Sequence, residues 1–217
     1  MTDVPHAAKA ARVKRDRGAR AQKSAERRAA ILSAALDEFT AQGFAAARLD
    51  DVARRAGVAK GTIYLHFRDK EALFQELIRS VLGPVVTSLE AAPFADLPLR
   101  AVAEQLMNRF VHEIYASPRK HVLRLVIAEG GRFPHIAEFY YREVLERVLT
   151  MVRRLAQRAF ERGELADDSL VRFPQLMGAP AVVAIVWSAL FERLAPLDVE
   201  AFLQAHLDLL FGKRRGG

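Results

Sequence analysis

Apolar residues recur with helical spacing through most of the chain. From Glu26 to Gly43 they occupy one helical face, and Gly43 is placed to end that helix. A second, two-turn helix is predicted from Leu49 to Ala56, because its apolar residues follow the i, i+3, i+4, i+7 spacing. The apolar face of the first helix contains Ile31, Leu32, Ala35, Leu36 and Phe39.

A short third helix is predicted to begin near Lys60, with Ile63 and Phe67 on its buried side. This stretch mixes glycine with β-branched and aromatic residues, which form isolated helices poorly, so helix propensity does not explain its composition. Asp69 is placed as the N-cap of a fourth helix. The inner stripe of that helix contains Leu73, Phe74, Leu77, Ile78 and Val81.

Longer amphipathic segments follow Pro93, and Pro134 is well placed at the first position of the longest one. The sequence shows neither an alternating strand pattern nor a repeat of about 20 to 50 residues. We therefore expect an all-α protein, with a small N-terminal bundle and a larger C-terminal bundle. The helices predicted in the C-terminal part span residues 99–114, 121–129, 134–163, 180–194 and 199–211.

Composition narrows the function classes. The chain has 51% hydrophobic and 27% charged residues, which is ordinary for a soluble globular protein. It has no apolar run of ~18 residues and no leader-like segment, so we expect neither a membrane span nor secretion, and we expect a cytoplasmic protein. Without cysteine, and with six histidines that lack metal-site spacing, disulfides and a metal centre are not expected. No convergent catalytic groups or phosphate loop stand out, so we expect neither an enzyme nor a cofactor.

The net charge of +7 is concentrated at the ends of the chain. Residues 1–28 contain nine Lys and Arg against three acidic residues, and Lys213, Arg214 and Arg215 follow the last predicted helix. Clustered cations of this kind suggest a polyanionic partner such as nucleic acid. The alternative is a solvated tail with no partner.

The second and third predicted helices have the spacing of a helix-turn-helix. Ala53 is small where two helices would cross, Gly57 suits a left-handed turn position, and Ile63 would fill the space between the helices. On these residues alone, an ordinary corner in a helical core is favoured over DNA binding. The outward side of the third helix favours DNA, because it offers hydrogen-bond donors and aromatic edges without an acidic residue. Its outward residues are Lys60, Gly61, Thr62, Tyr64 and His66.

Residues 26–78 resemble the DNA-binding domain of the TetR/AcrR family of transcriptional regulators. The resemblance runs without a gap through Phe44, Ala53, Gly57, Val58, Gly61, Thr62, Tyr64, His66, Phe67 and residues 70–73. It implies that Lys60, Gly61, Thr62, Tyr64 and His66 contact the major groove and flanking backbone of double-stranded operator DNA, and that Lys70 binds a phosphate. Ala47 and Arg48 stand where the family usually has a capping Thr or Ser, and Arg48 could replace the lost contact with a longer cationic one.

The resemblance also implies a domain organisation. We expect a basic, flexible arm over residues 1–25, a DNA-binding domain over 26–72, an effector-binding and dimerisation domain over 73–212 and a basic tail over 213–217. Family members with basic extensions suggest that the arm contacts the minor groove or backbone. The candidate residues in the arm are Arg12, Lys14, Arg15, Arg17 and Arg20.

The C-terminal bundle is expected to bind a small apolar or amphipathic effector. Apolar bulk with a few polar tips suits such a pocket, although aromatic residues at helical spacing are more often simply core. The candidate pocket residues are Met107, Phe110, His112, Tyr115, Phe133, Tyr140, Tyr141, Met151 and Trp187.

The last two predicted helices are apolar on more than one face, so we expect a twofold homodimer that buries them. Proline at position 84 either bends the fourth helix, which could then transmit effector binding to the DNA-binding domain, or ends it. The favoured function is an effector-released repressor. An activator of the same fold, a helix-turn-helix used for protein contacts and an all-α enzyme remain as alternatives.

Overall fold

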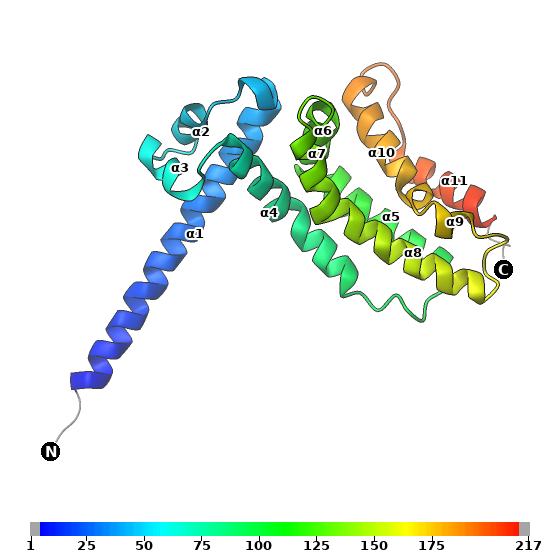
Figure 1. Ribbon diagram of the computed structural model, residues 1–217, viewed down its shortest axis with the longest axis horizontal. Helices are drawn as coiled ribbons and strands as arrows, with labels where there is room; N and C mark the ends of the chain where they lie inside the picture. The colour runs from blue at the N-terminus through cyan, green and yellow to red at the C-terminus, as the bar shows by residue number, and fades with distance from the viewer. Residues whose placement is uncertain (1–4, 213–217) are drawn as a thin grey trace. The chain divides into compact units, whose positions relative to one another are not determined.

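The computed structural model describes the backbone of residues 5–212 and the solvent exposure of Gly18 and residues 21–212. The regular secondary structure of this range is entirely helical, with loops between the helices and no strand, which confirms the expected all-α fold (Figure 1). The chain divides into an N-terminal unit, Met1–Leu77, and a C-terminal unit, Ile78–Gly217. None of the described helices is long and apolar enough to span a membrane.

The N-terminal unit is built around three phenylalanine rings. Phe39, Phe44 and Phe74 are buried, and their ring centroids lie 5.8, 5.1 and 5.3 Å apart. Ile63 on the third helix is also completely buried, as predicted. The helices of this unit are α1 (Pro5–Ala46), α2 (Leu49–Arg55), α3 (Lys60–His66) and the first part of α4 (Lys70–Glu90).

The helix predicted from Glu26 begins much earlier, at Pro5. The apolar stripe begins only near residue 31 because the core lies against the second half of α1. Gly43, with φ 73° and ψ 169°, interrupts the helix as predicted, but a last turn continues to Ala46. The side chains of Arg12, Lys14, Arg15, Arg17 and Arg20, and residues 213–217, lie outside the described part of the chain.

The C-terminal unit is a bundle in which α5 packs against α8 and α11, and α10 packs against α6 and α11. Its largest core cluster includes Ala103, Ala156, Ala184 and Leu207, which are almost completely buried. The elements of this unit, besides the end of α4, are α5 (Leu99–Arg109), η1 (Phe110–Tyr115), α6 (Arg119–Glu129), α7 (Pro134–Tyr140), η2 (Tyr141–Leu145), α8 (Glu146–Glu161), α9 (Ser169–Arg172), α10 (Gln175–Leu190) and α11 (Val199–Phe211).

Two prolines lie inside helices. Pro84 does not end α4, which continues to Glu90, so the alternative in which it terminates the helix is wrong. Pro180 was expected at a helix start, but α10 begins at Gln175 and ends at Leu190 rather than 194. Buried Met177 and Pro180 share the inner face of α10, so core packing offsets the hydrogen bond that proline cannot make.

The long helix predicted from Pro134 is formed by three consecutive segments, because the π-helical segment η2 separates the α-helices α7 and α8. The preceding helix likewise ends in the π-helical segment η1. Such segments shift the side chains that follow around the helix axis, which an apolar pattern with a fixed period does not reveal. Short α9 was not predicted, because one turn is too short to produce a periodic pattern.

Candidate nucleic-acid interface

The short helix α3 is held by two buried side chains. Ile63 has no exposed surface and Phe67 is 3% exposed, while the guanidinium of Arg28 on α1 lies 5.4 Å from the centre of the Phe67 ring. Gly57, with φ +67°, makes the turn between α2 and α3, where a side chain would be strained. Poor helix formers can therefore occupy α3, because tertiary anchoring fixes it.

The opposite side of α3 is open to solvent. Lys60, Gly61 and Tyr64 are exposed, whereas Thr62 and His66 are half-buried. The Tyr64 side chain is 48% exposed and Leu65, which follows it, is 85% exposed. A Cβ at Gly61 would meet no atom within 4 Å, so packing inside the chain does not require glycine there. A partner that approaches the backbone closely would require it.

Lys60 is already paired within the unit. Its Nζ donates to Oδ2 of Asp50 on α2 at 2.7 Å, and this hydrogen bond is the main cause that raises the pKa of Lys60. Both side chains are substantially exposed, so water screens the pair and a phosphate could compete for the ammonium group. The structure thus places an acid next to a predicted DNA contact, which the pattern of α3 alone did not reveal.

Lys70 joins the start of α4 to the end of α1. Its Nζ donates to the carbonyl oxygen of Ala45 at 2.7 Å and lies 4.8 Å from the centre of the Phe44 ring. Asp69 caps α4 as predicted, since its Oδ1 accepts from the backbone N–H of Ala72 at 2.7 Å. An ammonium group has three donors and can bind more than one acceptor at a time.

Arg48 is exposed at the start of α2, and its side chain makes no capping hydrogen bond there. This agrees with the loss of a cap expected from the sequence. Its long cationic side chain is available for a backbone phosphate.

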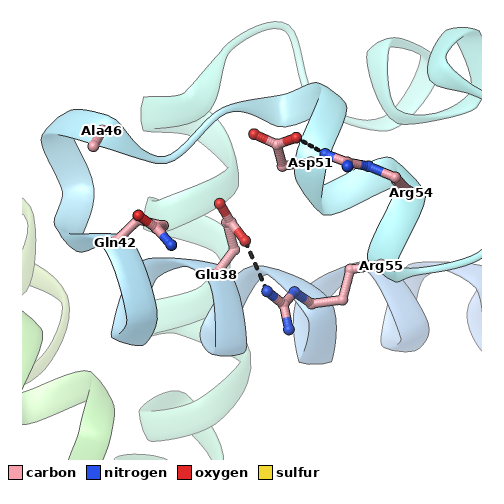
Figure 2. Close-up of a pocket in the computed structure, with 6 residues that line it drawn as sticks. All are labelled: Glu38, Gln42, Ala46, Asp51, Arg54 and Arg55. Atoms are coloured by element: carbon pink, nitrogen blue, oxygen red, sulfur yellow. Dashed lines mark hydrogen bonds and ion pairs between the residues drawn. The ribbon is translucent and has the colours of Figure 1, made fainter.

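A polar cavity of about 550 Å³ lies between α1 and α2, and the sequence did not indicate it (Figure 2). Glu38 is 5% exposed and accepts a hydrogen bond from Arg55 at 3.0 Å, while Arg54 pairs with Asp51 at the other wall. The charges across the cavity are balanced, and the Glu38–Arg55 pair joins α2 to α1, whereas the Arg54–Asp51 pair lies within α2. The cavity is lined by Glu38, Gln42, Ala46, Asp51, Arg54 and Arg55.

Residues 31–77 match the family described as bacterial regulatory proteins, tetR family, and residues 99–195 match the AefR-like transcriptional repressor C-terminal domain. Together these segments cover most of the chain and both units. The chain belongs to the TetR family. Its helix-turn-helix and helical C-terminal unit are those of this family.

Curated relatives of this TetR-family chain are transcriptional regulators. SrpR of Pseudomonas putida is 28% identical over 145 residues, covering 67% of the chain and 66% of SrpR. RutR of Escherichia coli K12 is 37% identical over 89 residues, covering 41% of the chain and 42% of RutR. The chain thus spans less than two thirds of either relative.

Solved structures show the same fold over most of their length. NalD of Pseudomonas aeruginosa, described as the secondary repressor of the MexAB-OprM multidrug efflux pump, aligns with a TM-score of 0.71 and 22% identity, covering 89% of this chain and 100% of NalD. FadR of Bacillus subtilis, solved in complex with stearoyl-CoA, aligns with a TM-score of 0.69 and 20% identity, covering 85% of the chain and 98% of FadR.

The predicted effector residues do not form a single group. Met107 and Phe110 are buried in the main core cluster, and Tyr115 and Met151 pack against it. Phe133 is half-buried, and burial raises the pKa of Tyr140 to about 12. Trp187 is half-buried and donates from Nε1 to the carbonyl oxygen of Ala195 at 2.6 Å. His112 and Tyr141 are exposed and lie outside that cluster.

Proposed function

We propose that this TetR-family chain is a homodimeric repressor that binds a palindromic operator through α3 and releases it when a small molecule binds the C-terminal unit. The observation that carries the proposal is the contrast between the two sides of α3. Its inner residues are completely or nearly buried, while Tyr64 is 48% and Leu65 is 85% exposed. A DNA groove would cover this surface.

The dimer is supported by the apolar outer face of α10. Val182, Val183 and Leu190 are 55%, 45% and 64% exposed, and Leu194 and Leu209 are even more exposed. Exposed apolar residues gathered on α10, with further ones after it and on α11, favour burial against a second copy. A twofold dimer would present its two recognition helices about 34 to 36 Å apart, which matches successive major grooves.

Helix α4 is the proposed route between effector and DNA. Its first residue, Lys70, belongs to the N-terminal unit, and its second half is held within the C-terminal unit. There Arg147 donates to both carboxylate oxygens of Glu90, with Nε at 2.9 Å, and the Arg79 guanidinium lies 5.0 Å from the Phe139 ring centre. An effector that shifts η2 or α8 would therefore move α4, and with it the spacing of the recognition helices.

The function is tested by binding of the purified chain to its own upstream DNA, measured by fluorescence anisotropy at several salt concentrations. We expect Tyr64→Ala and Lys60→Ala to weaken specific binding about tenfold. Gln157→Ala on the exposed face of α8 is the matched control and should bind as the wild type does. Equal affinity for unrelated DNA, or no effect of either substitution on α3, would refute the proposal.

The basic arm needs a separate test. Deletion of residues 1–20 is expected to lower affinity and reduce the dependence of binding on salt, since counterion release scales with the number of phosphates contacted. Unchanged affinity and an unchanged salt slope would show that the arm has no DNA contact.

A further inference from the structure

Arg124 on α6 reaches the inner face of α10. Its Nη2 donates to the hydroxyl oxygen of Ser188 at 2.8 Å, and Ser188 is only 7% exposed. Ser188 shares its face of α10 with buried Ala184 and Ile185. The guanidinium group therefore points into the C-terminal unit, away from the apolar outer face of α10.

The guanidinium of Arg124 lacks an acidic partner among the described residues. Its Nε is buried and makes no hydrogen bond in this part of the chain. Arg100, by contrast, is a partly buried arginine with two acidic partners, Glu104 and Asp208. A buried donor without an acceptor is costly, and one that carries charge is more so. A bound anion would remove this cost.

The surroundings of Arg124 add positive charge. His121 lies one turn earlier on α6, and its pKa is lowered by burial and then by the charges of Arg124 and Lys120. Lys120 lies 5.3 Å from the centre of the Tyr115 ring, on the side of η1. The lowered pKa favours the neutral form of His121, so the positive charge here is that of Lys120 and Arg124, and these two cations favour an anion over a neutral ligand.

Apolar residues lie next to Arg124 and Ser188. Ile185, one turn before Ser188, belongs to the core cluster that also contains Met107 and Phe110. Leu123, next to Arg124 on α6, packs against that cluster. A ligand with a charged end at Arg124 would therefore have apolar side chains beside its body, as amphipathic ligands require.

We propose that Arg124 binds the carboxylate of an amphipathic organic anion, with Nε–H donating to one carboxylate oxygen and a second guanidinium N–H to the other. Ser188, whose hydroxyl donates to the carbonyl oxygen of Ile185 at 3.0 Å, holds Nη2 in place. This inference rests on the proposed function and specifies its effector as a carboxylate. Arginine suits this role because its planar fork binds a carboxylate through two parallel hydrogen bonds.

The test uses the purified full-length chain without DNA. Its melting temperature is measured with linear carboxylates from butanoate to dodecanoate, with benzoate and phenylacetate, and with the primary amide of each. We expect at least one carboxylate to raise the melting temperature while its amide does not, since the amide keeps the shape and loses the charge. If every carboxylate and its amide act alike, the proposal is overturned.

Variants then locate the site by titration calorimetry with the stabilising carboxylate. Arg124→Gln should weaken binding about tenfold or more, and Arg124→Lys should bind with intermediate affinity because it keeps the charge without the fork. Arg153→Gln, which removes an exposed arginine on α8, is the matched control and should bind normally. Undiminished binding by Arg124→Gln would overturn the proposal.

Two further measurements separate this inference from other roles of Arg124. Without ligand, Arg124→Gln should be at least as stable as the wild type, because it removes a partly buried charge whose Nε donor is buried without an acceptor among the described residues. A variant that becomes monomeric and still binds the carboxylate would show that Arg124 pairs with the partner subunit instead, which overturns the proposal. DNA binding is measured separately, so a chain that binds carboxylate but no operator would refute the proposed function alone.

Discussion

The ammonium group of Lys60 lies 2.7 Å from a carboxylate oxygen of Asp50, so an acid on α2 competes with DNA for a cation of the recognition helix. The other oxygen of Asp50, Oδ1, is buried and accepts no hydrogen bond from the described residues. Asp50 is therefore poorly compensated when Lys60 leaves it for a phosphate. The Lys60–Asp50 pair would therefore weaken DNA binding in general. Tight binding would then require the additional contacts that only the operator sequence offers.

Asp50→Asn should strengthen DNA binding by removing this competitor and a negative charge near the phosphates. We expect an increase in affinity of about three- to tenfold at low salt, smaller at high salt because screening weakens the interaction. Binding to unrelated DNA should gain at least as much as operator binding. Anisotropy titrations at several salt concentrations measure both, and weaker binding by the variant would show that Asp50 instead positions Lys60 productively.

Leu65 is predicted to read a thymine methyl group. An apolar side chain that is 85% exposed beside Tyr64 gains nothing from the fold, whereas contact with a methyl in the major groove would bury it. Leu65→Ala should weaken operator binding about three- to tenfold and leave binding to unrelated DNA unchanged. The effect is measured by competition between operator and unrelated DNA.

Operator DNA with deoxyuridine in place of thymine provides the control for Leu65. If the contact exists, uridine at the contacted position weakens wild-type binding and has little further effect on the Leu65→Ala variant. If the loss of affinity from uridine at every position simply adds to the loss from Leu65→Ala, then Leu65 contacts no thymine methyl group.

The DNA-binding unit could be predicted from sequence in more detail than the C-terminal unit, and the reason is physical. Ile63, Phe67 and Asp69 act through local spacing, which the chain order displays directly. The pairs Lys60–Asp50, Glu38–Arg55 and Arg124–Ser188 join residues 10, 17 and 64 positions apart, so only tertiary packing brings them together. The π-helical segments likewise shift the side chains of η1 and η2 without leaving a periodic signal.

Prolines gave mixed signals, since Pro134 is the first residue of α7 as predicted, whereas other prolines lie inside helices. Pro180 lies within α10 rather than at its start, and Pro84 lies within α4. In both helices, buried neighbours such as Met177 and Leu82 hold the backbone in place. The tendency of proline to break a helix is overridden here because one face of each helix is buried. That burial depends on tertiary contacts, which the sequence alone does not show.

The Glu38–Arg55 pair should stabilise the DNA-binding unit. The Glu38 side chain is 7% exposed, so Arg55→Gln would leave a buried carboxylate without its cation. We expect a loss of about 1 to 3 kcal/mol in the free energy of unfolding, less than for a fully buried pair because Arg55 is half exposed. Urea denaturation followed by circular dichroism measures it.

Arg54→Gln is the matched control in the same cavity (Figure 2). The Arg54 side chain is 77% exposed, and its pair with Asp51 should contribute less than about 1 kcal/mol. Equal losses for the two variants would show that burial of Glu38 does not set the strength of its pair.

The outer face of α10 should control the oligomeric state. Val183→Asp places a charge on a surface where Val182 and Leu190 are 55% and 64% exposed, and a charge buried against a second copy without a partner is strongly unfavourable. We expect the wild type to be a dimer and the variant a monomer at micromolar concentration by light scattering. Gln157→Asp, exposed on α8, should remain dimeric. Each half of a palindromic operator needs one recognition helix, so the monomeric variant should also lose operator affinity while it keeps its helical content. If the Val183→Asp protein is still a dimer, the dimer interface lies elsewhere.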